Sequence, residues 1–201
     1  MGCRKICYTV FILGLLSACQ KSHSQSDDNG YTARIENIRI EKDKELLTEG
    51  VIDDQAIENF KGLQYFPVDT NFRVLAQIKK ADMQAVNFGT TKTEIQTYYR
   101  YCELSFKIGD STSHLMAYAF DSSKVDMLFI PFRDKTSGKE SYGGGRYIEM
   151  PYNGEKDAII LDFNLAFNPY CHYNKDYTCP LVPYDNTLNI AITAGEKKFH
   201  D

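Results

Sequence analysis

The chain has 201 residues, of which 43% are hydrophobic, 25% charged and 13% aromatic. This ordinary globular composition excludes collagen-like, disordered and multi-span membrane proteins. The net charge of −4 lacks the basic excess of a nucleic-acid-binding surface, so nucleic acid is not an expected partner.

Residues 1–18 have the pattern of a bacterial lipoprotein signal peptide. Two basic residues precede an apolar run that is too short to span a membrane and ends in Leu16-Ser17-Ala18-Cys19. The small residues before Cys19 match a lipobox, which predicts acylation of the Cys19 thiol and anchoring to a membrane. A plain signal peptide with a coincidental cysteine is the alternative. We expect a cell-envelope protein, with the periplasmic side of the outer membrane favoured and the inner membrane or cell surface left open.

The rest of the chain is predicted to form a tether and one domain. Residues 19–30 are polar and lack apolar periodicity, which favours a flexible tether. Residues 31–201 are expected to form a single β-rich domain. Its first segment, Tyr31 to Gly50, has helix-like spacing of apolar residues and a glycine at its end.

After Pro67 the pattern changes to that of strands. Alternating apolar and polar residues predict strands within 72–79, 101–108 and 188–192, and Gly109-Asp110 predicts a hairpin turn into 115–120. The continuous apolar runs 127–132 and 158–161 are typical of strands covered on both faces. The fold class is therefore mainly β, an antiparallel barrel or sandwich with a short N-terminal helical segment.

A glycine-rich stretch offers the first candidate site. Three glycines, Gly143 to Gly145, precede Arg146 and Tyr147 and would let the backbone approach a ligand closely. The planar guanidinium of Arg146 suits a two-point contact with a carboxylate. The alternative is structural, a turn in which Arg146 pairs with a buried acid such as Asp162.

Polar residues after the apolar run 158–161 extend this candidate site. Asp162, Asn164 and Asn168 follow the run, and a carboxylate at the end of a buried strand needs a partner. Seven of the 14 tyrosines lie between Tyr142 and Tyr184, where aromatic faces with hydroxyl rims would suit a ligand or equally the flank of a core.

Three cysteines remain after the signal peptide and Cys19. Cys102 lies on the apolar face of its strand and is expected to be a buried small side chain. Cys171 and Cys179 are eight residues apart, and a disulfide between them would contribute about 2.5 kcal/mol through loop entropy, although free thiols remain equally open. A zinc site with His172 is disfavoured because adjacent extended residues point apart. We therefore predict no metal and no cofactor.

The order of these motifs resembles the domain of unknown function 1684 family of bacterial and archaeal proteins. The resemblance spans about residues 60–197, from the block at Phe60 to Pro67, through the glycine stretch, to Ala194-Gly195-Glu196-Lys197. Many members resemble secreted lipoproteins. The resemblance implies no established activity, but it implies that certain residues belong to the family's signature: Arg146, Asp162, Asn164, Asn168, Cys171, Cys179, Asn186 and Glu196.

Three functional hypotheses follow. The first is a membrane-anchored binding domain for a small anionic or sugar-like ligand, held by Arg146, Tyr147, Asp134, Asp162, Asn164 and Asn168. The second is a hydrolase-like enzyme with Asp134 or Asp162 as general base. The third is a structural or interaction protein of the envelope, in which the same residues form a polar network.

Overall fold

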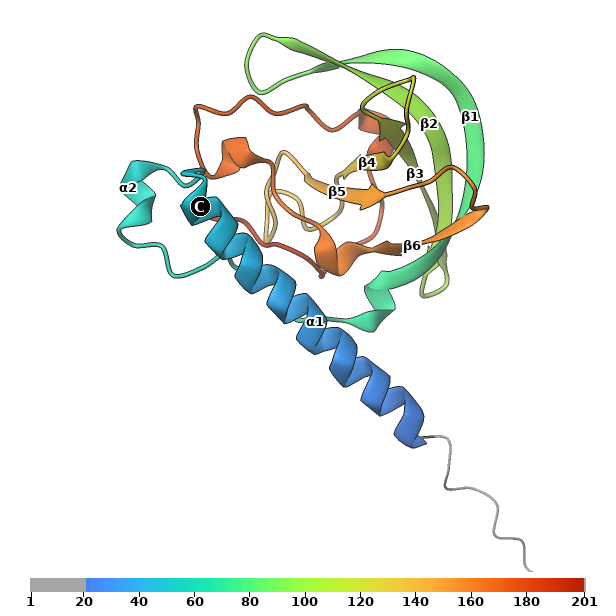
Figure 1. The fold of residues 1–201 in the computed structure, drawn as a ribbon, viewed down its shortest axis with the longest axis horizontal. Helices are drawn as coiled ribbons and strands as arrows, with labels where there is room; N and C mark the ends of the chain where they lie inside the picture. The colour runs from blue at the N-terminus through green and yellow to red at the C-terminus, as the bar shows by residue number, and fades with distance from the viewer. Residues whose placement is uncertain (1–20, 201) are drawn as a thin grey trace, which may run out of the picture.

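A curled antiparallel sheet forms the body of the protein, and a long helix leads into it (Figure 1). The computed structural model describes residues 21–200, so the predicted signal peptide and Cys19 lie outside the described part. The six-stranded sheet has the order β5-β4-β3-β2-β1-β6 and curls into a half-barrel. The prediction of a mainly β, antiparallel fold is confirmed.

The helices are α1 (Lys21–Thr48) and α2 (Asp54–Ile57). The strands are β1 (Arg73–Gly89), β2 (Ile95–Ile108), β3 (Ser111–Ala119), β4 (Met127–Phe132), β5 (Arg146–Pro151) and β6 (Ala158–Asp162). Short 3₁₀ turns lie at Thr70–Phe72, Phe163–Leu165, Tyr170–His172 and Tyr184–Asn186.

The three central strands are long, and irregular pairing accompanies their curvature. The register of β1 against β2 shifts between Lys80 and Gln84, and that of β2 against β3 shifts between Arg100 and Cys102. Such shifts increase the local bend and twist of a strand. The predicted hairpin at Gly109-Asp110 joins β2 to β3, with Gly109 at φ +57°.

Irregular segments, rather than a second sheet, fill the inside of the half-barrel. Strand residues such as Leu104, Leu128 and Leu161 pack with Phe163 and Ile192, which come from the chain after β6. Cys102 is fully buried in this core, as expected for a small apolar side chain.

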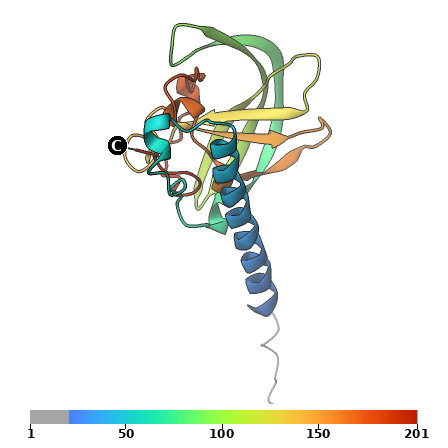
Figure 2. The same ribbon diagram turned by 60° about the vertical axis from the view of Figure 1, so that its left-hand side comes forward.

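Helix α1 rests on the body along one face. The buried or half-buried residues Tyr31, Ile35, Arg39, Lys42 and Leu46 recur at helical spacing. The C-terminal part of the helix lies against the body, whereas its beginning projects away from it (Figure 2).

The helix ends where the sequence predicts. Gly50 has φ +65°, the N–H of Gly50 donates to the carbonyl of Leu47, and the N–H of Val51 donates to that of Leu46. This pairing is a Schellman ending, which favours glycine at the left-handed position.

Several predicted elements differ from the structure. The segment from Lys21 to Gly30 is helical, so the flexible tether predicted there is wrong for those residues, and the helical segment is longer than expected. No strand forms at 188–192, where the alternation reflects Leu188 and Ile192 packing into the core from an irregular segment. Strand β5 was not expected. Strand β6 is covered on one face only, since Ile160 is 41% exposed at the sheet edge.

Within the described residues, no helix combines the length and apolar character that a membrane crossing requires.

Candidate functional site

Arg146 and Asp134 form a fully buried ion pair. Arg146 Nη2 lies 2.9 Å from Asp134 Oδ2, and neither side chain has any exposed surface. The prediction that Arg146 pairs with Asp162 is therefore wrong. The remaining oxygen of Asp134, Oδ1, accepts from the backbone N–H groups of Thr136 (2.7 Å) and Ile192 (3.1 Å). A general base must reach the proton that it removes, so this buried and fully engaged carboxylate does not support the hydrolase hypothesis.

The same guanidinium fastens the C-terminal segment to the sheet. Arg146 donates to the backbone carbonyls of Ile192 (2.9 Å), Ala194 and Glu196 (3.1 Å). Three charge-assisted hydrogen bonds from one buried side chain hold this segment, which otherwise makes an isolated bridge between Glu196 and Tyr65 instead of joining the sheet as a strand. Arg146 therefore acts within the fold, and we name Arg146, Asp134 and these three carbonyls the arginine clamp.

The glycine stretch before Arg146 also allows the backbone to pack closely against neighbouring segments. Gly145 has φ +95°, and a side chain there would come within 2.6 Å of the carbonyl oxygen of Phe132 and of Val182 Cγ2. Only glycine fits this close approach. The hydroxyl of the adjacent Tyr147, which is buried, donates to the carbonyl of Pro180.

Asp162 and Asn164 belong to a second polar network, which joins β6 to α1. The hydroxyl of Tyr31 donates to the carboxylate of Asp162, and its oxygen lies 2.8 Å from Oδ1 and 2.7 Å from Oδ2. Asn164 donates from Nδ2 to Asp162 Oδ1 (3.1 Å) and to the carbonyl of Asp69 (2.8 Å). This network lies at the start of the packed part of the helix and is separate from the arginine clamp.

A third network centres on Glu196, whose carboxylate is 1% exposed. Glu196 Oε2 accepts from the backbone N–H of Asn168 (2.9 Å) and from the hydroxyl of Tyr173. The Asn168 side chain in turn donates to the carbonyl of Lys197 (2.7 Å). Three of the six predicted ligand-binding residues, Asp134, Arg146 and Asn168, are thus committed to holding the C-terminal segment.

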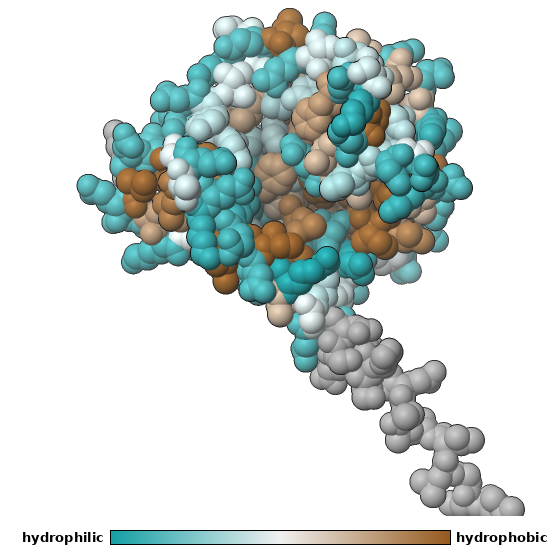
Figure 3. Space-filling model, viewed as in Figure 1, coloured by the Kyte–Doolittle hydropathy of each residue, from teal (hydrophilic) through white to brown (hydrophobic). Residues whose placement is uncertain are grey.

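A pocket of about 280 Å³ lies between α1 and the body, and we name it the helix pocket. Its walls come from α1, from the chain before β1, from Glu149 of β5 and from the segments after β6. They are formed by Ile38, Arg39, Lys42, Tyr65, Glu149, Asn164, Leu165, Ala166, Phe167 and Glu196. The surface in Figure 3 is hollowed above α1, and apolar residues lie inside the hollow. Asn164 contributes to these walls, so one residue of the predicted site does line a pocket.

The helix pocket is distinguished by its unpaired polar atoms. Among the residues that the structure describes, Arg39 Nε, Arg39 Nη2, the Tyr65 hydroxyl and Glu196 Oε1 are buried without a hydrogen-bond partner. Arg39 is 7% exposed and its guanidinium carbon lies 4.4 Å from the centre of the Tyr65 ring. Within residues 21–200 its one ion pair uses Nη1, which lies 3.1 Å from Glu36 Oε1. Buried polar groups are almost always hydrogen-bonded, so four such atoms around one pocket need an explanation.

Burial also changes the proton affinity of the acids in the helix pocket. Desolvation raises the pKa of Glu196, while nearby Lys42 and the hydrogen bond from Tyr173 lower it in part. Desolvation likewise raises the pKa of Tyr65, and the neighbouring Glu196 raises it further. Both shifts favour the uncharged forms of Glu196 and Tyr65.

Sequence reasoning missed Arg39 and Tyr65. Arg39 resembles any of the many charges on α1, and only its position four residues after Ile35 and seven before Leu46 indicates the buried face. Glu196 was implied only by the family resemblance.

The remaining predicted residues lie elsewhere. Cys171 and Cys179 are free thiols, and the backbone N–H of Cys171 donates to Cys179 Sγ at 3.2 Å. His172 Nε2 accepts from the backbone N–H of Phe199 at 2.8 Å, and its ring stacks on Tyr142. Among the described residues no three histidine, cysteine or acidic side chains are placed to hold a metal ion.

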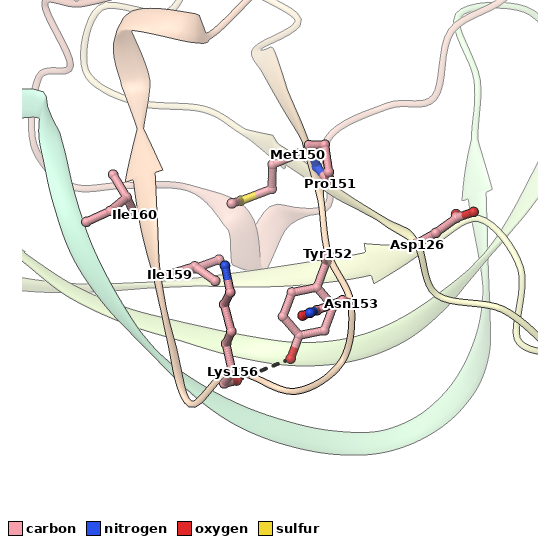
Figure 4. A pocket seen from close by; sticks show the side chains of 8 residues that line it. All are labelled: Asp126, Met150, Pro151, Tyr152, Asn153, Lys156, Ile159 and Ile160. Carbon is pink, nitrogen blue, oxygen red and sulfur yellow. Dashed lines mark hydrogen bonds between the residues drawn. The ribbon is translucent and has the colours of Figure 1, made fainter. Parts of the chain in front are cut away.

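A larger cavity of about 480 Å³ opens between the free edges of β5 and β6 (Figure 4). Met150, Tyr152 and Ile159 line it, and the Tyr152 hydroxyl donates to the carbonyl of Lys156 at 3.3 Å. None of the unpartnered buried atoms of residues 21–200 belongs to its walls. The helix pocket is therefore the better candidate site.

Comparison with known proteins gives a family but no activity. A family model described as "Protein of unknown function (DUF1684)" matches residues 58–197. The solution NMR structure of an uncharacterised protein from gene locus rrnAC0354 of Haloarcula marismortui is similar, with a TM-score of 0.68 and 34% sequence identity, covering 86% of this chain and 97% of that chain. None of the curated proteins matches.

Proposed function

We propose that this chain, which belongs to the DUF1684 family of proteins of unknown function, is a binding domain for a small organic anion. The helix pocket is its site. The observation that carries the proposal is the buried guanidinium of Arg39, which has two nitrogens without a partner among the described residues. A guanidinium of this kind suits the two oxygens of a carboxylate.

The other walls of the pocket define the rest of the ligand. Lys42 adds a second cation, with Nζ 4.6 Å from the centre of the Phe167 ring, and the Tyr65 hydroxyl adds a donor. Ile38, Leu165 and Phe167 offer an apolar surface. The volume of about 280 Å³ is at the lower end of the range for small-molecule sites. These features favour a short carboxylate with an apolar body over a neutral sugar.

Benzoate is a suitable probe because it combines a carboxylate with a small apolar ring. We expect benzoate to raise the melting temperature of the protein and to shift the NMR signals of Leu165 and Phe167, whereas uncharged benzamide should do neither. Arg39→Met should abolish both effects. Arg34→Met is the matched control on the same helix, since Arg34 is exposed and lies outside the pocket walls.

The stability of Arg39→Met separates binding from a structural role. A buried guanidinium with two unbonded nitrogens costs free energy in the ligand-free protein, so the variant should be at least as stable as the wild type. Unchanged benzoate binding by a folded Arg39→Met variant would exclude this site. So would the absence of any benzoate effect on the wild type at millimolar concentration.

The proposal also includes a membrane anchor, based on the Leu16-Ser17-Ala18-Cys19 pattern. Two or three acyl chains on Cys19 would hold the protein lastingly at a membrane. In a bacterial host fed radiolabelled palmitate, the wild type should carry label and sediment with membranes. Cys19→Ala should carry no label and lose the membrane association, and equal labelling of both would refute the anchor.

A further inference from the structure

Two cysteines that are distant from the helix pocket lie side by side on separately fixed segments. Cys171 is on the 3₁₀ turn Tyr170–His172, and its N–H points at Cys179 Sγ, 3.2 Å away. Cys179 is held against the loop that follows β1, because it donates from its N–H to Thr91 Oγ1 (3.1 Å) and accepts at its carbonyl from the Thr91 N–H (2.9 Å). The two sulfurs therefore meet through the fold rather than through a flexible loop.

The two thiols differ in access. Cys171 is partly exposed and lines a surface pocket with His172 and Phe199, whereas Cys179 is 6% exposed. An exposed thiol beside a buried one is the arrangement of an attacking and a resolving cysteine.

We infer that Cys171 and Cys179 form a thiol–disulfide exchange site, with Cys171 as the attacking thiol and Cys179 as the resolving thiol. The inference is independent of the anion site, which shares none of these residues. Its substrate class is a small disulfide or the disulfide of a partner protein.

The exchange balances in two steps. The Cys171 thiolate attacks one sulfur of the incoming disulfide, which forms a mixed disulfide and releases the other sulfur as a thiolate. Cys179 then gives its proton to the thiolate released in the first step and attacks Cys171 Sγ, which forms the Cys171–Cys179 bond and releases the second thiolate. That thiolate takes from water the proton that Cys171 had lost to water. The incoming disulfide is reduced to two thiols and the cysteine pair is oxidised by two electrons.

Hydrogen bonds around the sulfurs support this division of roles. The Cys179 thiol, followed by the hydroxyls of Thr91 and Tyr142, stabilises the Cys171 thiolate and lowers the pKa of Cys171 to about 7. Donation to Cys171 and burial raise the pKa of Cys179. At neutral pH about half of Cys171 is then thiolate, against a few per cent of an ordinary cysteine.

The test uses the purified full chain and glutathione disulfide as the probe. The wild type should lose two hydrogens in mass, with Cys171 and Cys179 in one cross-linked peptide, and dithiothreitol should reverse the change. Cys179→Ser should stop at the mixed disulfide and keep one glutathione on Cys171. Cys171→Ser should gain none on Cys179, because Cys179 is buried. Cys102→Ala is the matched control and should exchange like the wild type, since it keeps an apolar side chain in the core.

A measurement on the unmodified protein covers the case in which a variant fails to fold. Iodoacetamide at neutral pH should alkylate Cys171 about tenfold faster than free glutathione, and Cys179 much more slowly. A stable glutathione adduct on the wild type, glutathione on Cys179 of a folded Cys171→Ser variant, or alkylation of Cys171 no faster than that of glutathione would each overturn the inference.

Discussion

At the scale of single residues, the buried charges have two opposite environments. Arg146 has four acceptors, one carboxylate and three carbonyls, and among the described residues only its Nε lacks a partner. Arg39 is almost as buried, yet in the described chain two of its nitrogens have no acceptor. A satisfied buried cation stabilises a particular fold, whereas an unsatisfied one is a cost that a ligand can offset.

Arg146→Met tests the arginine clamp. Removing the guanidinium leaves three carbonyls without their donor and a buried carboxylate without its cation, so we expect a loss of about 3–5 kcal/mol in the free energy of unfolding. Urea denaturation measures it. Lys124→Met is the control, since Lys124 pairs with Asp126 at the exposed surface and its loss should leave the urea midpoint unchanged. A midpoint for Arg146→Met equal to that of this control would contradict the clamp.

The partner of Arg146 could not be predicted from the sequence. The sequence does indicate that a buried guanidinium needs an acid, but Asp134 and Asp162 both follow apolar strands and look alike along the chain. The choice depends on the pairing of β4 with β5, which brings Phe132 opposite Arg146 and so places Asp134 close by. This is a non-local contact that no spacing rule contains.

At the scale of elements, α1 is tied to the body by a few polar contacts along one face. Tyr31 joins it to Asp162, Arg39 lies over Tyr65, and Asp43 Oδ1 accepts from the backbone N–H of Leu63 at 3.1 Å. Of these ties, the contact between Arg39 and Tyr65 lies in the wall of the helix pocket.

Tyr31→Phe should loosen the helix at its first tie. Asp162 loses a hydroxyl donor while remaining largely buried, which costs about 1–3 kcal/mol. Hydrogen exchange should show faster exchange of the α1 amides around Tyr31 and Ile35, with β2 and β3 unaffected. Tyr184→Phe is the control because Tyr184 is 88% exposed. Equal exchange of α1 in both variants would show that the hydroxyl does not hold the helix.

The strands differ in how well local sequence predicts them. Alternation predicts β2 and the first half of β1 because one face of each is buried or half-buried and the other is more exposed, whereas β3 is predicted from the hairpin turn at Gly109-Asp110. Alternation misses β5, since Arg146 is a charged residue inside the core and Glu149 follows. It also predicts a strand at 188–192 that does not form, because Ile192 is held by a side-chain contact with Asp134 rather than by a sheet ladder.

At the scale of the whole molecule, the fold depends on segments that have no regular structure. The half-barrel leaves a side open, and the chain after β6 fills it with Phe163, Leu188 and Ile192. Sequence patterns reveal sheet-forming strands well, but such filling segments have no period, so the helix pocket lay beyond prediction, whereas the pairing of Cys171 with Cys179 was an open possibility from their spacing.

The stability of the whole molecule should depend on pH through His172. Burial lowers the pKa of His172 to about 4, and the nearby His200 adds to the effect. Between about pH 6.5 and 4 the unfolded chain binds a proton at this position and the folded chain does not. Stability should therefore fall as the pH falls through this window, by on the order of 3 kcal/mol at most.

His172→Gln provides the comparison, since its amide oxygen can still accept from the backbone N–H of Phe199. As the pH falls through this window, the urea midpoint of the wild type should fall toward that of His172→Gln. Only the wild type has a histidine at this position whose protonation favours the unfolded chain. Parallel curves would mean that His172 does not control the acid sensitivity.

The arginine clamp has a consequence for the order in which the protein is made. Arg146 leaves the ribosome well before Ile192, Ala194 and Glu196, whose carbonyls it needs. A nascent chain that has emerged only through β6 contains the whole sheet, but its central guanidinium still lacks those acceptors. The arginine clamp therefore forms only after the chain has been synthesised past Glu196.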